Sequence, residues 1–89
     1  MAFYDINPQA PVHVLVIPKD HIENALAVEK KHAEVLSEVF ALAQEVAKKE
    51  RVAESGFRLV FNCGPDAGQA VSHLHLHVLG KRKLSWPPG

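Results

Sequence analysis

Three histidines stand at alternate positions in the stretch 71–80, which reads V-S-H-L-H-L-H-V-L-G. They are His73, His75 and His77, and they make up half of the six histidines in the chain. Because successive side chains of a β-strand point to opposite faces, a strand here would present all three imidazole rings on one face. Each ring has two polar nitrogens that need partners, so three aligned rings indicate a functional site rather than packing.

Two chemistries suit such a row of imidazoles, metal binding and nucleophilic catalysis. On a straight strand the α-carbons of His73 and His77 lie about 13 Å apart. Three rings that far apart cannot easily meet one zinc ion, whose bonds to nitrogen are about 2.0–2.1 Å long. A zinc site would therefore need two of the three rings and a further ligand, for which His13 and Asp5 are candidates.

Covalent catalysis uses an extended row more directly. If an acceptor holds Nδ1–H of one ring, Nε2 of that ring can attack phosphorus and form a transient phospho-histidine type intermediate. Its neighbours can contact the phosphate or protonate the leaving group. The row therefore favours nucleophilic catalysis, and zinc binding stays an alternative.

The elements that must hold this row are a small sheet and one helix. Residues 1–6, M-A-F-Y-D-I, predict a first strand that ends at the turn signal Asn7-Pro8. Residues 12–17, V-H-V-L-V-I, predict a strand covered on both faces and ended by Pro18, with His13 either a core residue or part of the site. Residues 57–63 predict a third strand, and the polar loop that follows it could present N–H groups to an anion.

A helix is predicted from about residue 28 to about residue 51, where apolar residues recur at three- and four-residue steps. We expect its apolar stripe to pack on the sheet and His32, in its first turn, to be a solvated surface residue. The stripe consists of Val35, Leu36, Val39, Phe40, Ala43, Val46 and Ala47.

Composition favours one small domain with a balanced surface. Ten basic and ten acidic side chains cancel over 89 residues, which gives no electrostatic indication of nucleic acid or of an anionic membrane as a partner. The single cysteine, Cys63, can form no disulfide within the chain. No long apolar run or leader is present, so we expect a cytoplasmic protein that does not enter membranes.

The histidine row resembles the motif of the histidine triad superfamily, His-φ-His-φ-His-φ-φ with φ apolar, which residues 73–79 match completely. The resemblance extends over nearly the whole chain. Its further motifs are D-I-N-P-Q-A-P at 5–11, H-V-L-V-I-P-K at 13–19, Asn62-x-Gly64, Gly68-Gln69 and W-P-P-G at 86–89. Together these are similar to the Hint branch, the histidine triad nucleotide-binding proteins.

This resemblance implies an α+β fold, with one main helix and an antiparallel sheet that continues across a homodimer. It implies that residues 1–89 are a single histidine triad (HIT) domain, short at its N-terminus relative to the family because a helix and strands that normally precede the Phe-x-Asp-Ile stretch are missing. It also implies a purine nucleoside phosphoramidase, a hydrolase that cleaves the P–N bond of adenosine or guanosine 5′-phosphoramidates through a nucleotidyl-histidine.

The same resemblance implies roles for individual residues. His75 would be the nucleophile, His77 and His73 would orient it and help with phosphate and leaving group, and His13 would complete the cluster. Trp86 would reach toward the partner subunit, and no cofactor or metal is required. The substrate-binding residues would be Phe3, Asp5, Ile6, Leu15, Asn62, Gly68, Gln69, Ala70 and Val71.

Ala70 departs from the Hint pattern, which usually has serine there. The absence of that hydroxyl predicts a modest loss of activity, which Ala70→Ser should restore. Together with the short N-terminus, this keeps an alternative open: a nucleotide-binding scaffold protein with little turnover. Other branches of the superfamily, which include dinucleoside polyphosphate hydrolases and nucleotidyl transferases, fit the W-P-P-G ending less well.

Overall fold

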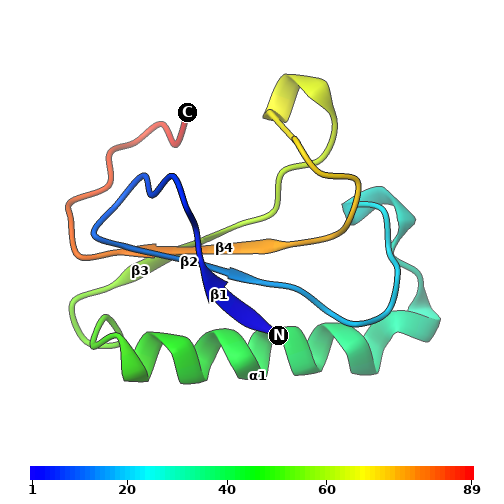
Figure 1. Cartoon of the computed structure of the whole chain (residues 1–89), viewed down its shortest axis with the longest axis horizontal. Coiled ribbons are helices and arrows are strands. Elements are labelled where there is room, and N and C mark those ends of the chain that lie inside the picture. The colour runs from blue at the N-terminus through cyan, green and yellow to red at the C-terminus, as the bar shows by residue number, and fades with distance from the viewer.

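The computed structural model describes all 89 residues as a four-stranded antiparallel sheet with one long helix packed on one face (Figure 1). The strand order is β1-β2-β4-β3. The predicted α+β class, with one main helix and an antiparallel sheet, is confirmed. The strands are β1 (Ala2–Tyr4), β2 (Val12–Val16), β3 (Phe57–Val60) and β4 (Leu76–Gly80), and the helix is α1 (Ala33–Lys49). Short 3-10 turns are η1 (Ala25–Ala27), η2 (Lys30–His32) and η3 (Pro65–Ala67).

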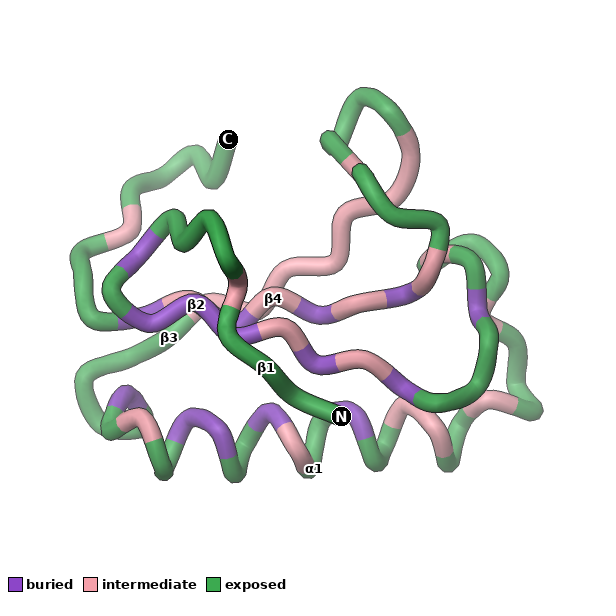
Figure 2. Tube along the Cα trace, in the orientation of Figure 1, coloured by how far each residue is buried: buried purple, intermediate pink, exposed green.

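The core lies between α1 and one face of the sheet. Alternate residues of β2 and β4 point toward the helix, so buried and half-buried positions alternate along β4, and along β2 except at His13, which is also buried (Figure 2). Most of the buried side chains are small or β-branched, which lets the helix approach the central strands closely. The core residues are Val12, Val14, Val16, Val39, Ala43, Val46, Ala47, Val52, Leu76 and Val78.

The opposite face of the sheet has no second layer of secondary structure. Leu15 is only half-buried and Ile17 likewise, so the prediction that both faces of the second strand are covered is wrong along most of its length. His13 is the exception and is buried, because the segment after β1 returns over it and Gln9 bonds to its ring. The loop around η3 and the C-terminal tail both rise on this face, away from the helix (Figure 1).

The strands are shorter than their sequence patterns predict. The histidine strand begins only at Leu76, so His73 and His75 precede it. The last ladder pair joins Leu76 to Val16, and beyond that point β2 runs into Pro18, which has no N–H to donate. Burial nevertheless alternates from His73 to Gly80, so the predicted placement of the three histidines on one face is confirmed.

The helix begins five residues later than its pattern predicts, because residues 25–32 contain two short 3-10 turns instead. His32 is half-buried rather than solvated, since its Nδ1 accepts the N–H of Glu29 at 2.9 Å. Phe40 is exposed, and Leu42 packs against the core in its place.

Gly80 ends β4 where the chain passes close to the residue that follows the helix. A Cβ at Gly80 would lie 2.7 Å from Cγ1 of the fully buried Val52, so this position accepts no side chain without rearrangement. Beyond it the tail turns back along β3, where Nη2 of Arg58 donates to the carbonyl of Ser85 at 3.1 Å. Trp86 follows, with 81% of its surface exposed.

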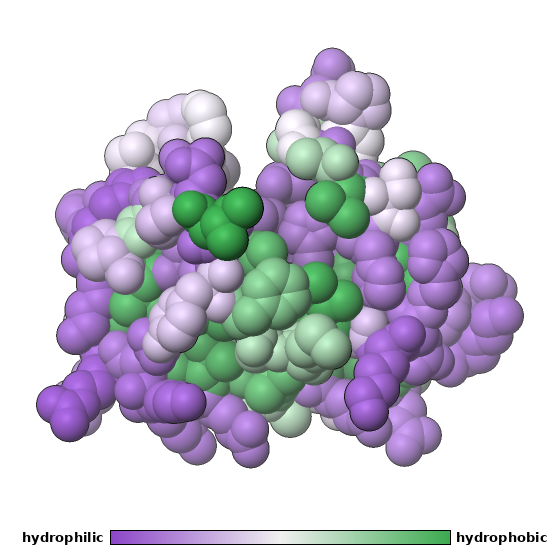
Figure 3. Space-filling model, in the orientation of Figure 1, coloured by the Kyte–Doolittle hydropathy of each residue, from purple (hydrophilic) through white to green (hydrophobic).

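Large apolar side chains are exposed around β1, the edge strand that lies in front of α1 (Figure 3). They include Met1, Phe3, Tyr4 and Ile6, and β1 has a sheet partner on one side only, β2. None of the helices has the length and apolar character needed to span a bilayer.

Candidate active site

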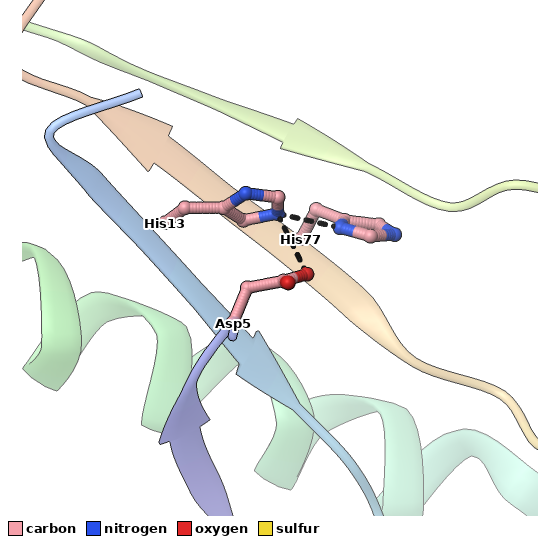
Figure 4. Close-up of side chains that lie close together, drawn as sticks. All are labelled: Asp5, His13 and His77. Carbon is pink, nitrogen blue, oxygen red and sulfur yellow. Dashed lines mark hydrogen bonds and ion pairs between the residues drawn. The ribbon is translucent and has the colours of Figure 1, made fainter. Parts of the chain in front are cut away.

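His13 and His77 form the centre of a polar cluster on the open face of the sheet (Figure 4). In the β2–β4 register His77 stands opposite Leu15, one step along from His13 on the same face, so the two rings are diagonal neighbours. Nε2 of His13 lies 2.8 Å from Nδ1 of His77, and their ring centroids are 5.1 Å apart. Oδ2 of Asp5 lies 3.5 Å from the same Nε2 of His13.

A backbone group determines the direction of this hydrogen bond. The N–H of Gln9 donates to Nδ1 of His13 at 3.0 Å, so a neutral His13 must hold its proton on Nε2. That proton is donated to Nδ1 of His77, which places the proton of a neutral His77 on Nε2. The chain Gln9, His13, His77 is therefore a directional relay that ends in one N–H group.

The Nε2 atom of His77 is buried and has no hydrogen-bond partner within the protein. Burial lowers the pKa of His77 below its usual 6.5, the proximity of His75 and His13 lowers it further, and Asp5 acts in the opposite direction. The ring is therefore neutral at pH 7, with Nε2–H unsatisfied. A buried donor without a partner needs a reason, and an acceptor atom of a bound ligand would provide one.

His75 is held in the complementary tautomer. Its Nδ1 lies 2.7 Å from the carbonyl oxygen of His73, so Nδ1 carries the proton and Nε2 has a free lone pair. The ring centroid of His75 lies 5.0 Å from that of His77. A nucleophilic nitrogen and a free N–H donor therefore stand on neighbouring rings.

His73 belongs to a different environment. Its Nε2 lies 3.1 Å from the carbonyl of Pro18, and its ring meets His21 edge to face with centroids 5.4 Å apart. The three triad rings therefore do not form one continuous network. Neither His21 nor the backbone groups of Gln9 and Pro18 carry a sequence signal that would identify them as neighbours of the histidines.

The loop before the triad is fixed by the side chain of Gln69. Its Oε1 accepts the N–H of Gly64 at 2.9 Å, and its Nε2 donates to the carbonyls of Glu23 and Val71, both at 3.0 Å. The amide therefore positions the loop, and Gly68 supplies the left-handed turn, with φ of 81°. Residues 70 and 71 are exposed, and their backbone N–H groups donate to no acceptor in the protein.

Only some of the residues predicted to contact the base and sugar lie close to one another. Phe3 pairs with Leu15 and Leu15 with His77, so these three lie in one row across the sheet. Ile6 lies fully exposed on the segment after β1. Asn62 follows β3 and lines a hollow of about 570 Å³ together with Trp86 and residues 66–67.

The cluster of Asp5, His13 and His77 brings three potential metal ligands within 4.8 Å of one another. Zinc would need the lone pair of His13 Nε2, but the Gln9 N–H occupies Nδ1 and so leaves the proton on Nε2. The two nitrogens that face each other are also 2.8 Å apart and share that proton. As arranged, this donor set fits a hydrogen-bonded relay and does not fit a zinc ion.

Comparison with known proteins shows the family of the chain. The HIT domain model matches residues 1–84. The whole chain is 47% identical to 70% of a 14 kDa zinc-binding protein from Zea mays, and 46% identical to 61% of the adenylylsulfatase HINT1 from Arabidopsis thaliana. A crystal structure of a HIT family hydrolase from Legionella pneumophila superposes with a TM-score of 0.96 at 48% identity, covering 99% of this chain and 79% of that one. The chain therefore belongs to the HIT domain family.

Proposed function

We propose that this protein is a purine nucleoside phosphoramidase that cleaves P–N bonds through a nucleotidyl-His75 intermediate. The observation that supports the proposal is that His75 and His77 are held in complementary tautomers. His75 has a lone pair on Nε2 because its Nδ1 is 2.7 Å from the His73 carbonyl, and His77 has an unsatisfied proton on Nε2. Attack on phosphorus and departure of an amine need one group of each kind.

In the first step, Nε2 of His75 forms a bond to phosphorus while the P–N bond to the leaving amine breaks. The departing nitrogen takes the Nε2 proton of His77, because an amine that leaves without a proton is a far stronger base than an imidazole ring. The hydrogen bond from His13 Nε2–H to Nδ1 stabilises the negative charge that develops on His77.

In the second step, water attacks the nucleotidyl phosphorus. Its hydroxyl stays on the nucleoside monophosphate, its proton returns to Nε2 of His77, and His75 leaves as a neutral ring. The free N–H groups of Ala70 and Val71 would hold the non-bridging oxygens, as oriented backbone donors do at other phosphate sites. Asp5 and Phe3 would contact the sugar and base.

A homodimer in the cytoplasm is part of this proposal. Ile6 is fully exposed within one chain, and the exposed Trp86 would reach the site of a partner subunit. The lone Cys63 suits a reducing compartment.

A second candidate is hydrolysis of adenylyl sulfate, favoured by the name of the Arabidopsis relative. The covalent intermediate would be the same, but sulfate leaves as a weak base and needs no proton. His77→Ala should therefore slow the phosphoramidate much more than adenylyl sulfate. Equal losses on both substrates would contradict the role of His77 as proton donor.

Intact-protein mass spectrometry after brief mixing with adenosine phosphoramidate tests the main proposal. We expect a nucleotidyl adduct and AMP release with the native protein and with the control His21→Ala, and neither with His75→Ala. Nucleotide binding without adduct or release in the native protein would instead identify a nucleotide-binding protein with little turnover.

A further inference from the structure

A second hollow, of about 650 Å³, lies at the end of the β3–β4 pair that is remote from His75. It is lined by Arg51, Ser55, Gly56, Phe57, Arg58, Lys81, Arg82, Lys83 and Leu84. The lining contains five of the ten Lys and Arg side chains of the chain, with neither a carboxylate nor a histidine. A protein whose charges cancel overall thus concentrates positive charge at one place.

None of these five cations forms an ion pair with an acidic side chain. The contacts between basic and acidic side chains join Lys31 to Glu29 at 3.9 Å and His13 to Asp5 at 3.5 Å, both outside the hollow. Like charges gathered without counter-charges repel one another and destabilise the folded state. Such a cluster is expected where an anion binds and supplies the missing negative charge.

The backbone of the hollow is strained at two of its cationic residues. Arg51, with φ of 60°, and Lys81, with φ of 70°, are the only residues other than glycine that have a positive φ. At Arg51 this conformation ends α1, because the N–H groups of Arg51 and Val52 donate to the carbonyls of Lys48 and Ala47 at 3.2 and 2.9 Å, whereas Lys81 follows the last residue of β4. Both Arg51 and Lys81 line the hollow.

Two guanidinium groups are already oriented by carbonyl oxygens. Nη2 of Arg58 donates to Ser85 at 3.1 Å, while Nε and Nη1 of Arg82 donate to Gln9 and Lys83 at 2.9 and 3.3 Å. Each guanidinium has five N–H donors, so others stay free for a ligand. Ordering these side chains before binding reduces the entropy lost on binding.

We propose that this hollow binds an oligophosphate chain, the multiply charged anion of a small molecule. Its volume exceeds the space that a single phosphate needs, and five cations are more than one phosphate can engage. The cations surround one hollow rather than follow a stripe, and Phe57 is the only aromatic residue in the lining, so the site lacks the row of stacking side chains typical of single-stranded nucleic acid binding. This proposal does not depend on the histidine chemistry.

Calorimetric titration with inorganic triphosphate at fixed ionic strength tests it. The variant Lys81→Asn/Lys83→Gln removes two cations, and asparagine tolerates the positive φ at position 81. We expect its affinity to fall about tenfold or more, since hydrogen bonds to charged groups are lost. The control Lys30→Gln/Lys31→Gln removes the same charge from an exposed turn and should bind as the native protein does.

Thermal unfolding separates a ligand site from a structural role. Without ligand the Lys81→Asn/Lys83→Gln variant should be at least as stable as the native protein, because repulsion is relieved, while triphosphate should raise the Tm of the native protein more than that of the variant. Arg51→Asn gives an independent test if the double variant does not fold. Equal binding by variant and native protein, no binding at all, or tighter binding of single-stranded RNA than of triphosphate would overturn the proposal.

Discussion

His73 and His77 stand two residues either side of His75, yet the fold gives them different surroundings. His77 joins His13 and Asp5 in a cluster in which only His13 is fully buried, and the Nε2–H of His77 is left without an acceptor. His73 bonds to the Pro18 carbonyl and stacks edge to face on His21. Equal spacing in the sequence therefore does not mean equal roles in the site.

The difference arises from what each residue offers to His75. His73 contributes its main-chain carbonyl, which accepts the Nδ1 proton of His75. Any residue at position 73 has that carbonyl. His77 contributes the Nε2–H group of its imidazole ring, which no other residue type has.

The largest expected effect that tests this contrast is on turnover. His77→Ala should lower kcat for adenosine phosphoramidate about 10²–10⁴-fold, the usual contribution of a general acid. His73→Ala retains the carbonyl and should cost less than about tenfold, the worth of one hydrogen bond. Single-turnover kinetics of the two variants measure this directly, and similar losses would remove the distinction between the two ends of the row.

The hydrogen bond from His13 to His77 should contribute less to turnover than His77 itself. His13→Ala removes the donor to His77 Nδ1 and the fixed tautomer, so we expect kcat to fall about tenfold with KM nearly unchanged. His13→Gln can place an amide N–H near the same atom and should recover part of the loss. If both variants lose the same activity, a packing defect rather than the relay is responsible.

The free energy of unfolding should depend on pH through His77. Because the pKa of His77 is lowered in the folded protein, the unfolded chain takes up its proton first as the pH falls. His77 therefore costs no stability above pH 6.5, and the free energy of unfolding decreases as the pH drops from about 6.5 toward the lowered value. Urea titrations across this range should show a weaker decrease for His77→Gln than for the native protein, and an equal decrease would contradict the lowered pKa of His77.

The smallest expected effect is that of removing metal. Since the His13 tautomer leaves a proton on Nε2 where zinc would need a lone pair, a strong chelator should leave phosphoramidase activity unchanged, and added zinc should not raise it. Activity that disappears in chelator and returns with zinc would show that the cluster rearranges around the ion.

Local patterns were sufficient for the broad architecture. The period of two at residues 73–79 and the period of three to four along the helix depend on side chains alone, and both placed the correct faces. The ends of the elements depend on hydrogen-bond partners distant in sequence, as at His75, which precedes β4 because the ladder to β2 stops at Val16. Such ends are not visible in a local pattern.

The candidate site, like the fold, could be predicted only in part from the sequence. The three histidines were identifiable from their spacing, the HIT domain resemblance implied that His13 completes their cluster, and Asp5 was implied only as a substrate contact or as a candidate ligand for zinc. The bonds from Gln9 to His13 and from His75 to the carbonyl of residue 73 involve the main chain, which carries no sequence signature. The proton positions that support the proposed chemistry could therefore be derived only from coordinates.

Trp86, the single tryptophan, also has a consequence for spectroscopy. Its indole is 81% exposed in a tail fixed to β3 through Ser85, far from the packed core. In an isolated chain its emission should resemble that of tryptophan in water both before and after denaturation, so fluorescence of the monomer would miss the loss of the core. Trp86 fluorescence would instead report on contacts of the tail. A blue shift in native buffer would signal that a neighbouring molecule covers the tail.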